Sequence, residues 1–168
     1  MTKLYMKQKV FSLRDRFTVK DESEQDRYYV EGELFTFGKK LHLYEMSGSE
    51  AAFIRQKLSA FLPCFEIFIN GALTATVRKE LSFMRPRFLI EGPGWRVEGS
   101  CWAHDYEIRQ GEKTIASIHK AWFSWGDSYE LEIEDPGNVV PALSVILCID
   151  CVMDRAGAAT GAASVNSN

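Results

Sequence analysis

The side chains in this sequence with the clearest chemical potential are three closely spaced pairs of cations. The pairs are Arg14 with Arg16, Lys39 with Lys40, and Arg85 with Arg87. Side chains two residues apart on a strand lie on the same face, so each arginine pair has the spacing of a fork for a phosphate group. We therefore take these six residues as candidate ligands for an anion. The alternative interpretation is solubilising charge scattered over the surface.

None of the histidines has the spacing of a catalytic or metal-binding group. His104 precedes Asp105, and adjacent residues on a strand point to opposite faces, so we expect a turn here rather than an acid–base pair. His42 and His119 lie in separate strand-like stretches, without a partner at metal-ligand spacing. We therefore expect a non-enzyme with no catalytic residue, no metal site and no cofactor.

The four cysteines offer a third kind of chemistry. Cys148 and Cys151 form a C-x-x-C motif, which in redox proteins lies at the N-terminus of a helix. Here the motif lies deep within an apolar stretch and no second C-x-x-C occurs, so we expect small buried side chains instead. Together with Cys64 and Cys101, these residues are consistent with free thiols in a reducing cytoplasm.

Charge and composition exclude some classes of partner. The 168 residues have a net charge of −3, whereas a dedicated nucleic-acid-binding domain is usually strongly basic. Lys3, Lys7 and Lys9 interrupt the N-terminal segment, so we expect no secretory signal sequence. We expect a cytoplasmic protein with no transmembrane segment and no nucleic-acid partner, peripheral to a membrane if its ligand is a lipid.

The elements that must position these groups are short strands. Apolar residues alternate with polar ones over most of the chain, as in Tyr129, Leu131 and Ile133, which flank glutamates. Asn70-Gly71 predicts a tight hairpin because both residues tolerate a positive φ. Strand-like runs recur at intervals of roughly 8–12 residues, a spacing typical of an all-β barrel or sandwich. We expect twelve strands, near residues 3–11, 15–20, 27–35, 40–46, 51–58, 64–69, 72–80, 86–91, 95–102, 105–110, 113–121 and 127–134.

The run from Val139 to Met153 departs from this pattern because it is apolar on nearly every face. As a helix it would span roughly 22 Å, short of a bilayer's hydrocarbon core of about 30 Å. A helix that is hydrophobic all round is normally buried on all sides, and among strands this requires the sheet to close around it. We predict a mainly β fold, a twelve-stranded antiparallel closed barrel around one central hydrophobic C-terminal α-helix. Residues 1–155 form this single domain, and residues 156–168 are expected to be a disordered tail.

Several motifs occur in an order that resembles a known family. They are Phe11–Glu22 (FSLRDRFTVKDE), Tyr29–Gly32 (YVEG), Phe37–Leu41 (FGKKL), Ile54–Leu58 (IRQKL), Glu91–Trp95 (EGPGW), His104–Ile108 (HDYEI) and Trp122–Asp127 (WFSWGD). With the closing apolar helix, these motifs resemble the LURP-one-related family over residues 3–155. The resemblance implies the fold of the tubby C-terminal domain and of phospholipid scramblases, a twelve-stranded barrel wrapped around a hydrophobic helix. The function of the family is largely unknown.

The resemblance also implies two directions for the function. Tubby domains bind phosphoinositide headgroups at a basic surface, and scramblases act on membrane lipids with calcium. Neither group's ligand residues match a motif here, and the cysteine-rich palmitoylation segment of a scramblase is absent, so no site is carried over. We expect a non-enzymatic soluble barrel that binds phospholipid or phosphoinositide headgroups at a basic outer surface. The alternative is a scaffold or protein-interaction module with no small-molecule ligand, which acts through an exposed strand edge or the aromatic residues near Trp122 and Trp125.

Overall fold

The computed structural model describes most of the 168-residue chain. The residues described are 1–7, 16–33, 37–58, 61–82, 85–123 and 126–163, and for residues 7, 122–123, 126–127 and 155–163 only the backbone is described. Arg14 and Trp125 are outside the described residues, and so is the side chain of Trp122.

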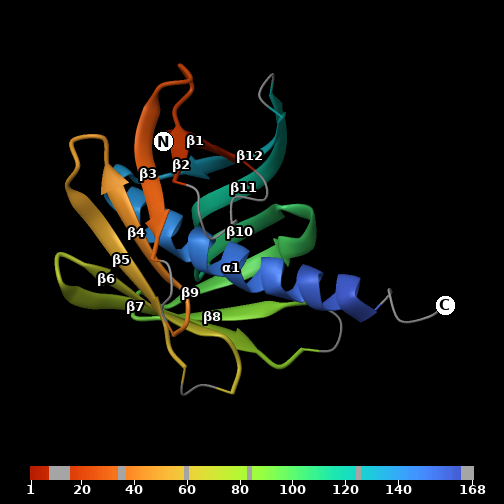
Figure 1. Ribbon diagram of the computed structural model, residues 1–168. Helices are drawn as coiled ribbons and strands as arrows, with labels where there is room; N and C mark the ends of the chain where they lie inside the picture. The colour runs from red at the N-terminus through yellow and green to blue at the C-terminus, as the bar shows by residue number, and fades with distance from the viewer. Residues whose placement is uncertain (8–15, 34–36, 59–60, 83–84, 124–125, 164–168) are drawn as a thin grey trace.

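Twelve strands and one long helix make up the described fold (Figure 1). The strands are β1 (Thr2–Lys7), β2 (Phe17–Lys20), β3 (Asp26–Gly32), β4 (Lys40–Glu45), β5 (Glu50–Gln56), β6 (Cys64–Ile69), β7 (Ala72–Glu80), β8 (Arg87–Glu91), β9 (Trp95–Ser100), β10 (Asp105–Gln110), β11 (Lys113–Phe123) and β12 (Gly126–Ile133). Short 3-10 turns η1 (Cys101–Ala103) and η2 (Pro136–Asn138) precede β10 and the helix α1 (Val139–Ala163). The expected strand number is confirmed, and the strand ends lie within a few residues of the predicted ones.

The strands form one closed antiparallel barrel. Each pairs with its neighbour along the chain, and β12 also pairs with β1, from Thr2 opposite Ile133 to Lys7 opposite Ser128. The ring closes between β1 and β2 at Tyr5 opposite Lys20. The described strands all have a neighbour on both sides, although β1 meets β2 at one position only, so the exposed strand edge that we expected as one docking route stays a prediction.

The connections alternate between the two ends of the barrel, because neighbouring strands run in opposite directions. One end carries tight turns and the start of α1, and we call it the helix-entry end; its turns include 46–49, 70–71, 92–94 and 111–112. At one of these turns Asn70 and Gly71 have φ values of 52° and 76°, as a type I′ hairpin requires. The other end, the helix-exit end, carries the longer connections, which are 33–39, 57–63, 81–86 and 101–104.

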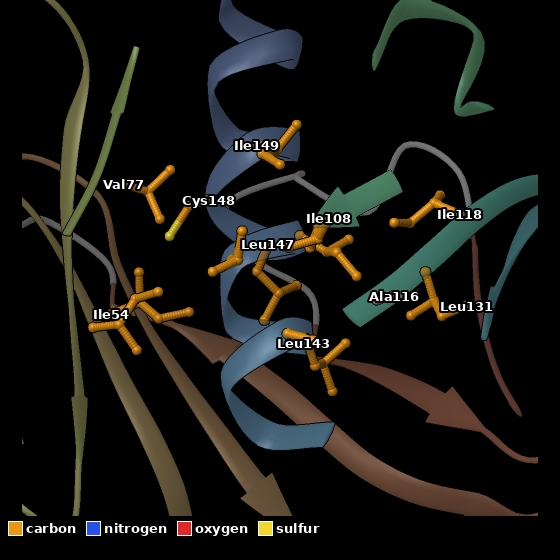
Figure 2. Close-up of a cluster of buried hydrophobic side chains, with 14 of the residues drawn as sticks. Ile54, Val77, Ile108, Ala116, Ile118, Leu131, Leu143, Leu147, Cys148 and Ile149 are labelled. Carbon is orange, nitrogen blue, oxygen red and sulfur yellow. The ribbon is translucent and has the colours of Figure 1, made fainter. Parts of the chain in front are cut away.

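The helix α1 passes through the ring of strands and forms the centre of the core (Figure 1). Its residues Ala142 to Cys151 are buried on every face. Figure 2 shows Leu143, Leu147 and Cys148 lying between two groups of strand residues, Ile54 and Val77 on one side and Ala116, Ile118 and Leu131 on the other. The segment Pro136–Asp154 is long and apolar enough to cross a membrane, but 72% of its apolar stretch is buried within the barrel. It therefore serves as the core helix that the sequence predicts.

The helix is longer than expected. It continues to Ala163, so residues 156–163, which we expected within a disordered tail, are helical, and residues 164–168 lie outside the described part. This segment is rich in alanine, which has the highest intrinsic helix propensity and needs no buried face to extend an existing helix. The expectation of a disordered tail was wrong for residues 156–163 because it rested only on their lack of side chains to bury.

Candidate functional site

The candidate cations that the structure describes all lie at the helix-exit end of the barrel. Arg16 comes directly before β2, and Lys39 and Lys40 lie at the start of β4. Arg85 and Arg87 lie at the start of β8. The antiparallel order brings the starts of β2, β4 and β8 to the same end. The three sequence pairs therefore belong to one end of the molecule, with Arg14 outside the described residues.

The cations on the β2–β4 side have partners within the barrel wall. The Arg16 guanidinium lies 3.4 Å from the centre of the Tyr29 ring, and its Nε is 3.8 Å from a Glu31 carboxylate oxygen. The Lys40 Nζ is 2.9 Å from Glu33 Oε2. An anion that binds here must compete with these exposed or half-buried carboxylates.

The cations on the β7–β8 side form fewer ion pairs. Lys79, Arg85 and Arg87 form no ion pair with another described residue. Glu80 lies opposite Arg87 across the two strands, yet no ion pair joins them. Ser82 forms two hydrogen bonds with the backbone of Arg85. Its Oγ donates to the Arg85 carbonyl, and the Arg85 backbone nitrogen donates to the same Oγ at 3.4 Å. Arg85 and Arg87 are therefore the most available pair for an added anion.

Three further cations at this end escaped the sequence analysis. Arg55 and Lys57 both approach Glu66, at 2.6 Å and 3.7 Å, and Lys79 lies near the end of β7. The sequence could have indicated these three cations by their position, because each lies near the end of a predicted strand that finishes at the helix-exit end. We define the basic rim as Arg16, Lys39, Lys40, Arg55, Lys57, Lys79, Arg85 and Arg87.

The opposite end of the barrel has the opposite charge. Its turns and strand ends carry more carboxylates than cations. The acidic residues include Asp21, Glu22, Glu24, Asp26, Glu45, Glu50, Glu91, Glu112, Glu134 and Asp135, and the cations include Lys3, Lys20, Arg27, Arg96, Arg109 and Lys113. Near the basic rim the acidic residues include Glu31, Glu33, Glu66, Glu80 and Asp105, fewer than the eight cations of the rim. The molecule is therefore electrically polarised along the helix axis, although its net charge is only −3.

A buried polar cluster lies beneath the helix-exit end. The Tyr129 hydroxyl donates to the carboxyl group of Asp150 on α1, and the His104 ring stacks on Tyr129 with centroids 4.9 Å apart. Burial raises the pKa of Asp150 to about 7, and the Tyr129 hydrogen bond opposes that rise only in part. Burial also raises the pKa of the nearby Cys101 thiol to about 12.

This cluster lacks the features of a catalytic set. A thiol with so high a pKa is not a nucleophile at neutral pH, and burial lowers the pKa of His104. No described residue pairs with His104 Nδ1 or with the hydroxyl of Tyr106. The cluster joins the end of the core helix to β10, β12 and the η1 turn, and we assign it a structural role.

The remaining histidines form pairs on the outer surface. His104 lies in a turn with φ of 50°, as expected, and the Asp105 carboxylate instead accepts a hydrogen bond from His119 Nδ1 at 2.9 Å. His42 lies between Glu33 at 2.9 Å and Glu50 at 2.6 Å. Burial lowers the pKa of His42, but the two glutamates outweigh it and the net pKa is raised. Among the described residues no group of three or more His, Cys, Asp or Glu could hold a metal ion.

Comparison with known proteins places this barrel in a family. The family model described as LURP-one-related matches residues 2–151. The chain belongs to the LURP-one-related family. The uncharacterized protein YxjI of Bacillus subtilis (strain 168) is 37% identical over 153 residues, which cover 91% of this chain and 94% of that protein. Neither description names an activity.

A solved structure supports the LURP-one-related fold. An X-ray structure of a protein from Arabidopsis thaliana has a TM-score of 0.58 and 16% identity, and the match covers 86% of this chain and 88% of that one. At this identity the likeness concerns the fold alone. The function of this LURP-one-related chain must therefore be argued from its own residues.

Two further features of this LURP-one-related chain do not form a ligand site for an anion. Cys148 and Cys151 are not disulfide-bonded and are fully buried in the core, as the sequence predicts. A surface hollow of about 300 Å³ opens at the helix-entry end, lined by residues 25–28 and 45–47. Its Asp26 bonds Lys20 Nζ at 2.7 Å, and that hydrogen bond lowers the pKa of Asp26. The acidic surroundings of this hollow repel anions, which leaves the basic rim as the candidate site.

Proposed function

We propose that this LURP-one-related barrel binds anionic phospholipid headgroups at its basic rim. The observation that carries the proposal is the uneven distribution of charge, with an excess of cations at the helix-exit end and an excess of carboxylates at the other. An anionic membrane attracts nearby lysine and arginine by about 1 kcal/mol each, and it repels an acidic surface. The dipole of the barrel would therefore orient it with the helix-exit end toward the lipid.

Within the rim, Arg85 and Arg87 are the residues we assign to direct phosphate contact. Their side chains are exposed and have no ion-pair partner among the described residues, so binding displaces no carboxylate. Arginine presents several N–H donors in a planar fork that matches phosphate oxygens. Arg16 and Lys40, which already contact Glu31 and Glu33, would contribute mainly to the surrounding field.

The proposed setting is the cytoplasmic face of a membrane, which the protein would visit as a peripheral binder. The anionic lipids of a cell are concentrated on that leaflet. The four cysteines are all buried and none is disulfide-bonded, which is consistent with a reducing compartment.

The test is the double substitution R85Q/R87Q in a vesicle flotation assay. Vesicles of phosphatidylcholine with about 30 mol% phosphatidylserine should bind the unmodified protein at about 0.05 M salt and release it at about 0.5 M. The loss of two cations should weaken binding by about 2 kcal/mol, which is roughly thirtyfold.

The matched control is R96Q/K113Q, which removes the same charge from the helix-entry end, where both residues lie on the surface. That variant should bind as the unmodified protein does. Vesicles that contain a phosphoinositide in place of phosphatidylserine, at equal total charge, provide a further comparison. Tighter binding to them would indicate recognition of that headgroup, and equal binding would indicate attraction to any anionic surface. Absence of binding at low salt, or equal losses for the two double variants, would contradict the proposal.

A further inference from the structure

Large apolar side chains are exposed at the helix-exit end on four consecutive connections of the barrel. They are Phe37, Leu58, Phe61, Leu81 and Trp102, with exposed fractions of 93%, 59%, 97%, 78% and 54%. We name these five residues the apolar rim. Single exposed apolar residues are ordinary on a protein surface, but a group at one end marks a site of interaction. The exposed large apolar residues of the helix-entry end, Met1, Met46 and Leu73, include no aromatic one.

Backbone contacts hold the first two of these connections side by side. The Lys39 backbone nitrogen donates to Gln56 Oε1 at 3.1 Å, and the Gln56 nitrogen donates to the Lys39 carbonyl at 2.8 Å. Gly38 has a φ of 81°, and a side chain added there would lie 2.9 Å from Leu58. The segment with Phe37 therefore packs directly on the segment with Leu58.

The next connections are held in the same way. The Lys79 nitrogen donates to the carbonyl of Pro63 at 2.9 Å, which ties the segment after Phe61 to the end of β7. Ser82 bonds the backbone of Arg85 and so holds the connection that begins with Leu81. Ser100 accepts from the Ala103 nitrogen at 3.3 Å and caps the turn that presents Trp102. Hydrogen bonds thus tie described residues beside the apolar rim to the barrel wall or to their own connection.

Basic residues alternate with the apolar ones along the same connections. Lys39 follows Phe37, Lys57 precedes Leu58, and Arg85 follows Leu81 within one connection. Leucine and aromatic side chains favour the boundary between headgroups and acyl chains, and lysine and arginine favour the phosphates just above it. Residues 156–163, which continue α1 at this end, contain no charged residue that would oppose approach to lipid.

We propose that the apolar rim inserts into the interface of an anionic bilayer, while the basic rim contacts the phosphates above it. This inference rests on the proposed function and deepens it, since it makes the ligand a bilayer rather than a free headgroup. The charge pattern favours a lipid surface as the occupant, because the side chains that surround the apolar rim are predominantly cationic. Binding then has a hydrophobic component that salt does not screen.

The first test is the double variant F61S/L81S on the same phosphatidylcholine–phosphatidylserine vesicles. Both side chains are almost fully exposed in the free protein, so their replacement should leave thermal unfolding unchanged. Vesicle affinity should fall at least about tenfold, because two apolar side chains no longer leave water on binding. The matched control is M46S/L73S, which removes exposed apolar side chains from the helix-entry end and should bind normally.

The second test uses Trp102 as a probe of depth. Phosphatidylcholine brominated on its acyl chains should quench part of the tryptophan fluorescence of the bound protein, and W102F should lose that part. The insertion proposal is wrong if F61S/L81S binds normally and bromolipid leaves the tryptophan fluorescence of the bound protein unchanged. If R85Q/R87Q still weakens binding in that case, the proposal of headgroup binding at the basic rim stands. If the unmodified protein binds no anionic vesicle, both proposals fail.

Discussion

At the scale of single residues, Asp150 is the most unusual group in the barrel. It lies on the core helix, and the groups that face it are Tyr129, Tyr106, Cys101, Asp154 and Lys39. Among the described residues, Tyr129 alone forms a hydrogen bond with the Asp150 carboxyl group. A buried carboxyl with so little compensation favours its neutral form, which is why burial raises its pKa to about 7.

This environment predicts that Asp150 lowers stability as the pH rises. A carboxyl whose pKa is raised in the folded state contributes stability below its unfolded pKa, near 3.8, and loses it as the pH passes 7. At about 1.4 kcal/mol for each pKa unit, the loss between about pH 5 and about pH 8 is about 3 kcal/mol. D150N carries no such titration, so its stability relative to the unmodified protein should improve over that range. Urea unfolding at several pH values measures the difference.

Other carboxylates make the protein more stable as the pH rises. The informative quantity is therefore the difference in unfolding free energy between D150N and the unmodified protein at each pH. Hydrogen bonds from Lys20, His42 and Lys3 lower the pKa values of Asp26, Glu33 and Glu132, and their stabilisation is lost in acid. These contributions are the same in D150N and cancel in the difference. Parallel stability curves for the two proteins would show that Asp150 is ionised in the fold at neutral pH.

At the scale of elements, α1 is the structural centre rather than a membrane anchor. The strands contribute one buried face each, whereas the helix is buried on all faces from Ala142 to Cys151. Each fully buried leucine or isoleucine in it contributes roughly 1.5–3 kcal/mol of burial. The barrel without this helix would enclose an empty apolar lumen, which close packing forbids.

The substitution Leu147→Asp should therefore unfold the protein. Leu147 is fully buried, and a carboxylate in its place would have no partner in the apolar core. The cost of at least about 5 kcal/mol is a large part of the usual stability of a domain. Circular dichroism in the near ultraviolet should lose its native signal. Leu147→Met, a volume-conserving control, should cost less than about 1.5 kcal/mol. A folded, soluble L147D protein would refute the core role of the helix.

At the scale of the whole molecule, closure of the barrel depends on β1. This strand pairs with β12 at six positions but with β2 at one, Tyr5 opposite Lys20. It thus completes the ring, and it contributes Leu4 and Met6 to the core. Closure also fixes the electrical polarity of the barrel, since it holds the cationic connections in one ring at the helix-exit end.

Deletion of residues 1–7 should consequently open the barrel. The edges of β2 and β12 and one side of the core helix would be exposed, which favours association between chains. We expect binding of a hydrophobic dye and loss of a cooperative thermal transition. Lys3→Ala, which keeps the strand but removes its ion pairs with Glu130 and Glu132, should still unfold cooperatively. A cooperative transition in the deleted protein would show that β1 is dispensable for closure.

The amino-acid sequence determined the architecture because the signals for it are local. A period of two, the Asn70-Gly71 turn and a segment apolar on every face predicted the strands, the hairpin and the central helix. The apolar segment also predicted the burial of Cys148 and Cys151. The spacing of Arg85 and Arg87 made them candidates, together with Arg14 and Arg16, but did not rank the two pairs. The predicted end of α1 was wrong. The residues after Arg155 have no apolar face to bury, which suggested disorder, but their alanines have a high helix propensity and continue the helix.

Only the tertiary structure decided which of these groups act together. The partners of Arg16 and Lys40 come from β3 and the connection after it, and Arg55 meets Glu66 across β5 and β6. The five apolar rim residues come from four connections, which antiparallel closure gathers at one end. Such proximity depends on strand direction and register across the whole ring. A local sequence pattern contains no such information, so the residues of the proposed site come together only once the barrel has closed.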